Sequence, residues 1–308
     1  MSFTFNKITF QDQFQKLQRV GDWLENMGIQ VSNTRFDEVL HLNKEIVEHH
    51  RSKRIEDLIE RYGNLKLWFA LTEASSFIQI HEMLKTQKSH IRPRAKLKKM
   101  LYGPFHSWDE DAESGNIEPR NTLFELESAA KFREAGVKIL GYDDVDFLFK
   151  KTQFNVQCKR IQSEKKIKDN VSEAAEQFYR RMKSRPNLKG IICISMDKLT
   201  GKEGMILKVT SPYDIRPKLS LISEAFLEKY RHLWHSLVNI NILAVLLFVH
   251  IVAIIEEKPL GLLTTCRDIA FDIIPRRAFY QLADYDLVVE LGKRLQGTAD
   301  VTWKSVDH

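Results

Sequence analysis

One short segment of the chain carries the residue types that metal-dependent chemistry requires. Asn155, Gln157 and Lys159 occupy alternate positions of a segment with strand character, so their side chains share one face. A lysine on a buried sheet face is costly unless it has a partner or a function. The preceding predicted strand carries Asp144 and Asp146, which share a face in the same way. Carboxylate and amide oxygens beside an ammonium group suit Mg²⁺ (or Mn²⁺) and a substrate phosphate.

The two predicted strands are joined by a polar turn at residues 150–152, which indicates an antiparallel hairpin. With the pivot inside this turn, Asp146 is expected roughly opposite Gln157. Asp144 is then expected roughly opposite Lys159. The carboxylates and the amide oxygen would converge beside the ammonium group, which can stabilise a metal-bound hydroxide or the charge that develops on a phosphate.

These strands resemble the PD-(D/E)xK nuclease superfamily, in particular members close to the type IV restriction endonucleases that carry a Gln-x-Lys variant. The motif reads Asp-Val-Asp-Phe at residues 144–147 and Phe-Asn-Val-Gln-Cys-Lys-Arg at residues 154–160. The resemblance covers about residues 120–200 and leaves the N-terminal third uncovered. It implies a restriction-endonuclease-like mixed central sheet flanked by helices. Gln157 stands where the family most often has an acidic residue, which removes one negative charge from the metal site.

Two predicted helices extend the resemblance on either side of the hairpin. Residues 122–134 read as a helix that resembles the first core helix of the superfamily. The resemblance implies that Glu125 is an acidic metal ligand, with Glu127 as the substitute. Residues 172–182 read as the helix after the lysine strand, and by the same resemblance Gln177 faces the site.

The expected site therefore has a catalytic set, from which the metal ligands are drawn, and a substrate-binding set. The expected catalytic residues are Glu125, Asp144, Asp146, Gln157 and Lys159. The expected ligands of Mg²⁺ or Mn²⁺ are Glu125, Asp144, Asp146 and Gln157. The expected substrate-binding residues are Arg160, Lys165, Lys166 and Gln177.

Two points about this site stay open. The spacing to the lysine strand favours Asp144 as the metal-binding aspartate by resemblance, whereas the expected hairpin register favours Asp146. Arg160, Lys165 and Lys166 follow the site strand directly, so they are placed either at its rim, where they would hold phosphates, or in a solvated loop.

Around the site, the pattern divides the chain into three parts. Residues 1–110 are predicted to be a helical N-terminal region, because apolar residues recur there at helical spacing. Residues 111–121 are polar and hold proline and glycine, which is typical of a linker. Residues 122–308 are the expected nuclease-like domain, in which helices and strands mix in the order of an α/β fold with helices on both sheet faces.

Composition and charge are those of a folded protein with a mild preference for polyanions. The chain has 43% hydrophobic residues and a formal net charge of +6. Three scattered cysteines are typical of reduced thiols in the cytoplasm. The most apolar run, residues 242–255, is shorter than the roughly 20 residues that span a bilayer. We therefore expect a cytoplasmic protein with no signal peptide and no membrane association.

The first functional hypothesis is a Mg²⁺-dependent nuclease that cuts DNA as an effector of bacterial restriction or anti-phage defence. RNA as a substrate stays open, as do a partner ATPase or helicase and a homo-oligomer. The second is a nucleic-acid-binding module on the same fold that has lost turnover through Gln157. The third is a helical adaptor that works through residues 1–110. Residues 85–99 form the densest basic run, which is either a nucleic-acid arm or a solvated helix end.

Overall fold

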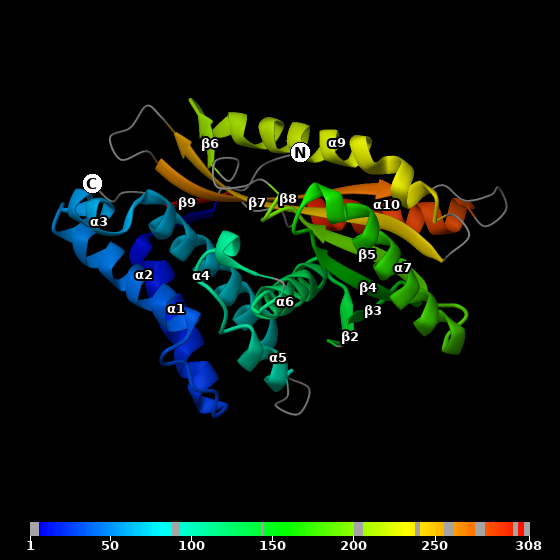
Figure 1. The fold of residues 1–308 in the computed structure, drawn as a ribbon, viewed down its shortest axis with the longest axis horizontal. Coiled ribbons are helices and arrows are strands. Elements are labelled where there is room, and N and C mark those ends of the chain that lie inside the picture. Colours follow the sequence, from blue (N-terminus) through cyan, green and yellow to red (C-terminus); the bar gives the residue numbers. More distant parts are fainter. Residues whose placement is uncertain are drawn as a thin grey trace. The chain divides into compact units, whose positions relative to one another are not determined.

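The structure is a computed structural model of the 308-residue chain, which folds as two compact units (Figure 1). It describes residues 6–87, 93–111, 113–142, 144–199, 206–237, 241–255, 262–274, 281–297 and 301–304. The first unit contains residues 1–123, 252–265 and 301–308, and the second contains residues 124–251 and 266–300. Each unit is described by itself below.

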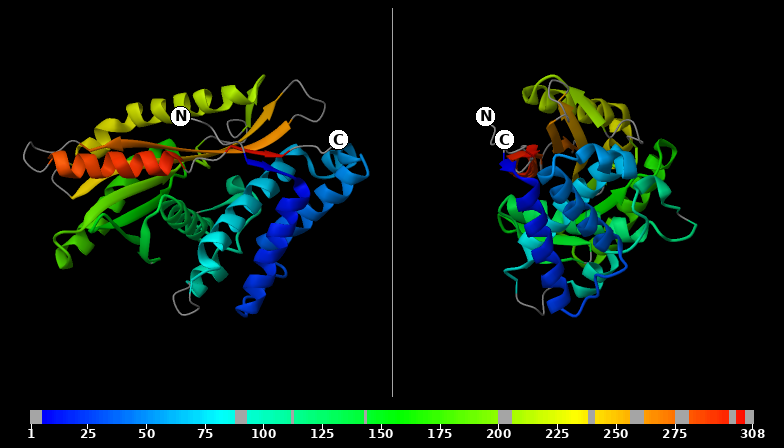
Figure 2. Two further views of the ribbon diagram at one scale, coloured as in Figure 1. Left: turned by 180° about the vertical axis from the view of Figure 1, so that it is seen from behind. Right: turned by 90° about the vertical axis from the view of Figure 1, so that its left-hand side faces the viewer.

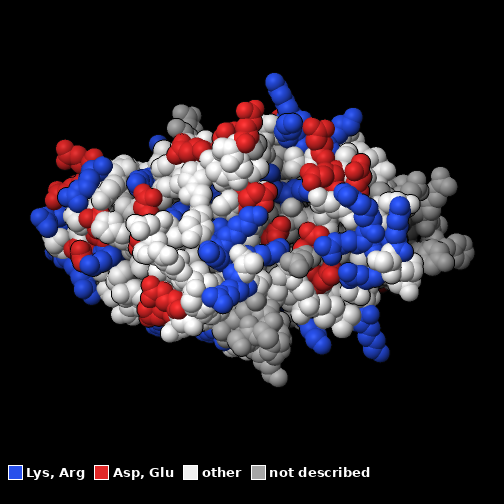
Figure 3. Space-filling model, turned by 60° about the horizontal axis from the view of Figure 1, so that its bottom comes forward, with Lys and Arg blue, Asp and Glu red and all other residues white. Residues whose placement is uncertain are grey.

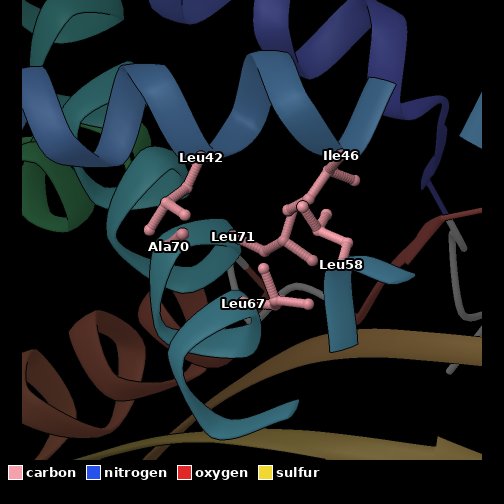
Figure 4. Close-up of a cluster of buried hydrophobic side chains, with 6 residues drawn as sticks. All are labelled: Leu42, Ile46, Leu58, Leu67, Ala70 and Leu71. Atoms are coloured by element: carbon pink, nitrogen blue, oxygen red, sulfur yellow. The ribbon is translucent and has the colours of Figure 1, made fainter. Parts of the chain in front are cut away.

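Helices dominate the first unit, as the apolar spacing predicts. They are α1 (Phe10–Asn26), α2 (Arg35–Arg51), α3 (Ile55–Tyr62), α4 (Asn64–Leu84) and α5 (Arg94–Lys99), and the short strands β1 (Asn6–Ile8) and β9 (Val301–Lys304) pair in parallel. Apolar side chains of α2, α3 and α4 meet in a core cluster (Figure 4): Leu42, Ile46, Leu58, Leu67, Ala70 and Leu71. The N-terminal region is therefore helical, with a core of its own.

Buried ion pairs hold the first turn of α6 (Glu118–Glu134) and the segment before it against these helices. Arg120, near the start of α6, pairs with Glu73 of α4, and its Nε lies 3.1 Å from Oε1 of Glu110. Glu73 also lies 3.3 Å from Nη1 of Arg35. Removing one member of such a buried set leaves an uncompensated charge, so the pairs fix the path of the chain here. The helix starts four residues before the predicted Thr122, and Pro119 fits its first turn because an N–H there needs no helical partner.

A mixed sheet of six strands forms the centre of the second unit. β3 (Val145–Phe149) is antiparallel to both of its neighbours, β2 (Lys138–Gly141) and β4 (Thr152–Arg160). β5 (Lys189–Ser195) is parallel to β4, and β7 (Ile242–Ile255) is parallel to β5. The strand order is β2-β3-β4-β5-β7-β8, where β8 is Leu262–Ile273, and β6 (Ile206–Val209) also pairs with β7. The predicted mixed α/β sheet after a helical region is therefore confirmed.

Four helices flank this sheet: α6, α7 (Ile167–Ser184), α9 (Ile215–His235) and α10 (Gln281–Gly297) (Figures 1 and 2). Within the described residues, no helix is long and apolar enough to span a membrane. The apolar run at residues 242–255 forms one strand, β7.

The two faces of the β3–β4 hairpin differ in chemistry. On one face, the Phe147 ring stacks on Phe154 at 4.9 Å and on Phe132 of α6 at 4.6 Å, and all three side chains are buried. On the other face, Gly190 of β5 leaves room for Phe178 of α7, since a Cβ at Gly190 would lie 2.9 Å from that ring. Helix α6 therefore covers the apolar face, and α7 covers the face that carries the polar side chains.

The aromatic stack predicts a large stability loss for Phe147→Ala. The change removes a ring that contacts both Phe132 and Phe154, and large-to-small changes of buried phenylalanines cost about 3–5 kcal/mol. Urea unfolding measures the loss. Leu221→Ala is the control, since this α9 side chain is 65% exposed and its truncation should change stability by no more than about 0.5 kcal/mol. Equal losses in the two variants would contradict the packing described.

Candidate active site

The β3–β4 hairpin turns through two residues, and this sets the register of the site. Lys150 and Lys151 have φ values of 45° and 68°, the left-handed conformation that two-residue hairpin turns require. Thr152 therefore belongs to β4 and pairs with Phe149. The predicted register, which treated residues 150–152 as the turn, was wrong by two residues. An even shift leaves every side chain on its expected face.

In the observed register, the aspartates contact amides. Asp146 lies opposite Asn155, whose Nδ2 donates to Asp146 Oδ1 at 2.8 Å. Gln157 Nε2 donates to Asp144 Oδ2 at 3.2 Å and to Asn155 Oδ1 at 2.6 Å. The expected pairings of Asp146 with Gln157 and of Asp144 with Lys159 are replaced by these contacts. The buried amides of Asn155 and Gln157 have partners, so the polar row is stable inside the fold.

Helix α7 presents a matching row of side chains to this face. Glu173, Gln177, Arg181 and Arg185 follow one another at four-residue intervals, which places them along one side of the helix and its C-terminal cap. At the N-terminal end of the row, Glu173 Oε1 accepts from Gln177 Nε2 at 2.8 Å. The same oxygen lies 3.0 Å from Nζ of Lys159, whose side chain is only 12% exposed. Glu173 therefore holds Lys159 and Gln177 together.

At the C-terminal end of α7, the two arginines neutralise the two aspartates. Arg181 Nη2 lies 2.5 Å from Asp144 Oδ2, and Arg185 Nη1 lies 3.1 Å from Asp146 Oδ2. A second nitrogen of Arg181 is 3.9 Å from Asp146 Oδ2. Each carboxylate therefore contacts both an amide of β4 and a guanidinium of α7.

We refer to these side chains of β4, α7 and the start of β3 as the α7 network. Its members are Asp144, Asp146, Asn155, Gln157, Lys159, Glu173, Gln177, Arg181 and Arg185. Three carboxylates in it face three cationic groups. Sequence reasoning missed Glu173, Arg181 and Arg185, and the signal that would have found them is their four-residue spacing from Gln177.

The predicted metal ligands are only partly brought together. Asp144, Asp146 and Gln157 meet on one face, whereas Glu125 is half-buried on α6, whose Phe132 packs on the opposite face. Within the part of the chain that the structure describes, no group of three or more histidine, cysteine, aspartate or glutamate side chains could hold a metal ion. The role of Glu125 as a ligand stays a prediction.

The donor types on the polar face nevertheless fit a hard cation. Two carboxylates and a side-chain amide are oxygen donors of the kind that Mg²⁺ takes alongside water and phosphate. The side chains of Asp144 and Asp146 are 30% and 14% exposed, so both are reached from solvent. Because each already has a guanidinium partner, a metal ion here would replace Arg181 and Arg185 as the counterion.

The predicted phosphate-binding residues after β4 lie in two different environments. Arg160 is buried, and its Nε and Nη2 donate to Asp197 Oδ2 at 3.0 and 2.7 Å, while Ser195 Oγ donates to Asp197 Oδ1. Lys165 and Lys166 are exposed in the single turn η3 (Glu164–Lys166). The structure therefore gives Arg160 a structural contact and leaves the two lysines facing solvent.

Glu164 anchors this single turn to α9. Its Oε2 accepts from Lys229 Nζ and from the Tyr230 hydroxyl, both at 2.8 Å. The hydrogen bonds from Lys229 and then Tyr230 lower the pKa of Glu164, which keeps it ionised. The turn that carries Lys165 and Lys166 is thus held to α9 through Glu164.

Two cysteines lie next to one another on the neighbouring strands β4 and β5. Cys158 of β4 and Cys193 of β5 are register partners, and both are free thiols. Burial raises the pKa of the Cys193 thiol well above its ordinary value, and the neighbouring Cys158 raises it further. Cys193 therefore stays protonated at neutral pH.

No protein-family model matches the chain, and neither a curated protein nor a solved structure matches it. The fold is a mixed α/β fold that follows a helical N-terminal region. What the protein does has to be inferred from the side chains and contacts of the α7 network.

The contact between Arg160 and Asp197 predicts coupled stability losses. Asp197→Ala leaves the buried Arg160 guanidinium without its carboxylate, and breaking a buried pair costs about 3–5 kcal/mol. The double variant Arg160→Met/Asp197→Ala should lose less than the sum of the two single variants, because no unpaired charge remains. Urea unfolding of the four proteins measures the coupling. Strictly additive losses would show that Arg160 does not depend on this carboxylate.

Proposed function

We propose that the second unit is a metal-dependent nuclease that hydrolyses phosphodiester bonds of DNA on the polar face of β3 and β4. The observation that carries the proposal is the meeting of Asp144, Asp146, Gln157 and Lys159 on one face of two neighbouring strands. A polar row of this kind, covered by a helix with matching charges, is far more specific than any one of its residues. Its accessible carboxylates offer oxygen ligands for Mg²⁺ or Mn²⁺.

The order of elements around the row supports the same proposal. A helix (α6) precedes the strands, a hairpin carries the motif, and a second helix (α7) follows the lysine strand and contributes Gln177. This is the order that the resemblance to PD-(D/E)xK nucleases implies. By that resemblance, the expected setting is bacterial restriction or anti-phage defence, with DNA as the partner.

Each side chain of the row has a role in this proposal. Asp144, Asp146 and Gln157 would hold Mg²⁺, which supplies an activated water and offsets charge on the phosphate. Glu173 orients Lys159, so its ammonium group would stabilise the charge that develops on the phosphate during in-line attack by water. Glu173 and Gln177 are positioning residues, since they act through Lys159.

A second candidate function is nucleic-acid binding without turnover. Two features favour it. Gln157 adds no negative charge to the site beside Asp144 and Asp146, and two arginines already neutralise these carboxylates. This candidate expects DNA binding that weakens as salt is raised, because released counterions drive such binding. It also expects no cleavage under any divalent cation.

Plasmid cleavage by wild type and Lys159→Ala tests the proposed function. With Mg²⁺, the wild type should nick or linearise DNA, and EDTA should abolish the activity. Removing one group that stabilises transition-state charge should lower the rate by about 10²–10³-fold. The control is Lys293→Ala, an exposed lysine of α10 outside the α7 network, which should cut at the wild-type rate. Undiminished cutting by Lys159→Ala would overturn the mechanism, and intact binding with no cutting by wild type would favour the second candidate.

A further inference from the structure

Arg181 and Arg185 supply the positive charge that Asp144 and Asp146 would otherwise take from a metal ion. The distances of 2.5 and 3.1 Å are those of direct ion pairs. A divalent cation bound to the same carboxylates would face both guanidinium groups at close range. Like charges at such separations repel strongly, so metal binding and arginine pairing exclude one another. When a metal ion binds the aspartates, the guanidinium groups of the two arginines therefore need other partners.

The two guanidinium groups are partly exposed to solvent. The side chains of Arg181 and Arg185 are 29% and 40% exposed, and Arg185 lies just past the last helical residue of α7. Ion pairs with this degree of exposure add little to stability, because solvent screens them. A bound metal ion would take over as the counterion of the two aspartates, so no carboxylate is left without a partner when the arginine side chains turn toward solvent.

The C-terminal end of α7 is a cationic surface that can bind phosphate together with the displaced arginines. Residues 179–185 contain four cationic side chains and no acidic one, and Arg180 and Lys183 are exposed. Tyr179 is 46% exposed, with the Lys183 ammonium 5.2 Å from its ring. In Figure 3, Lys and Arg side chains gather at the right of the view, the side on which α7 lies in Figure 1. Cationic groups beside an exposed aromatic ring suit phosphates and an unpaired base.

We propose that Arg181 and Arg185 exchange partners during the reaction. They pair with Asp144 and Asp146 when the site is without metal, and with phosphates of a bound nucleic-acid strand when metal takes the carboxylates. Guanidinium groups bind carboxylate and phosphate with the same two-pronged geometry, so the exchange preserves their hydrogen bonds. The proposal rests on the metal site of the proposed function, and it means that metal and nucleic acid raise each other's affinity.

Calorimetric titration of the full chain with Mn²⁺ tests the exchange. In wild type, a DNA oligonucleotide with uncleavable phosphorothioate linkages should tighten Mn²⁺ binding by about five-fold or more, in the usual range of such coupling. In Arg181→Gln/Arg185→Gln, Mn²⁺ should bind about five-fold or more tightly than in wild type without any DNA. The same variant should show less tightening than wild type when the oligonucleotide is added, because only the direct contact between phosphate and metal remains.

Arg180→Gln/Lys183→Gln is the matched control, since it removes two cations of the same helix that do not pair with the aspartates. It should weaken oligonucleotide binding and leave the Mn²⁺ affinity of the free protein unchanged. Mn²⁺ affinity in Arg181→Gln/Arg185→Gln that equals or falls below that of wild type would overturn the exchange. If that variant does not fold, the test rests on the two Mn²⁺ titrations of wild type, with and without the oligonucleotide. Equal Mn²⁺ affinity in these two titrations would overturn the exchange.

Failure of the exchange and failure of the proposed function give different results. Wild-type protein that couples Mn²⁺ and DNA binding without cutting DNA would retain the exchange and lose the nuclease. Wild-type protein that cuts DNA with no coupling between metal and strand would retain the nuclease and lose the exchange.

Discussion

Charged and amide side chains on the covered face of a sheet need ion-pair and hydrogen-bond partners from the element that covers them. In the second unit, this requirement falls on α7. Its residues at four-residue spacing meet the polar side chains of β3 and β4, so that Lys159 has Glu173 and each aspartate has an arginine. An unmatched member would leave a buried polar group or charge without a partner, which is costly. The same matching that stabilises the fold places Asp144, Asp146, Gln157 and Lys159 on one face.

The opposite face of the same strands shows why the hairpin tolerates so polar a side. There, stacked phenylalanines of β3, β4 and α6 provide the apolar burial that stabilises the sheet. The period-two alternation of a strand directs the stacked phenylalanines and the polar row to opposite faces. The hairpin therefore gains apolar packing on one face and can carry a row of polar side chains on the other.

Much of this arrangement could be predicted from the sequence, because it depends on local periodicity. Strand alternation placed Asp144, Asp146, Asn155, Gln157 and Lys159 on one face, and the elements on both sides of the hairpin were identified. The register was not, because Lys150-Lys151 lacks the Asn-Gly signal that marks a two-residue turn. The arginine partners depend on how α7 crosses the sheet, a long-range property that spacing alone does not reveal.

In our proposal, the polar face of β3 and β4 is a metal site whose resting counterions are arginines. A crystal structure of the wild-type protein soaked in Mn²⁺ and collected for anomalous scattering tests it most directly. The account predicts an anomalous peak in contact with the carboxylates of Asp144 and Asp146, with the Arg181 and Arg185 guanidinium groups withdrawn from them. A saturating soak that leaves both arginine pairs in place, with no peak at either aspartate, would contradict it.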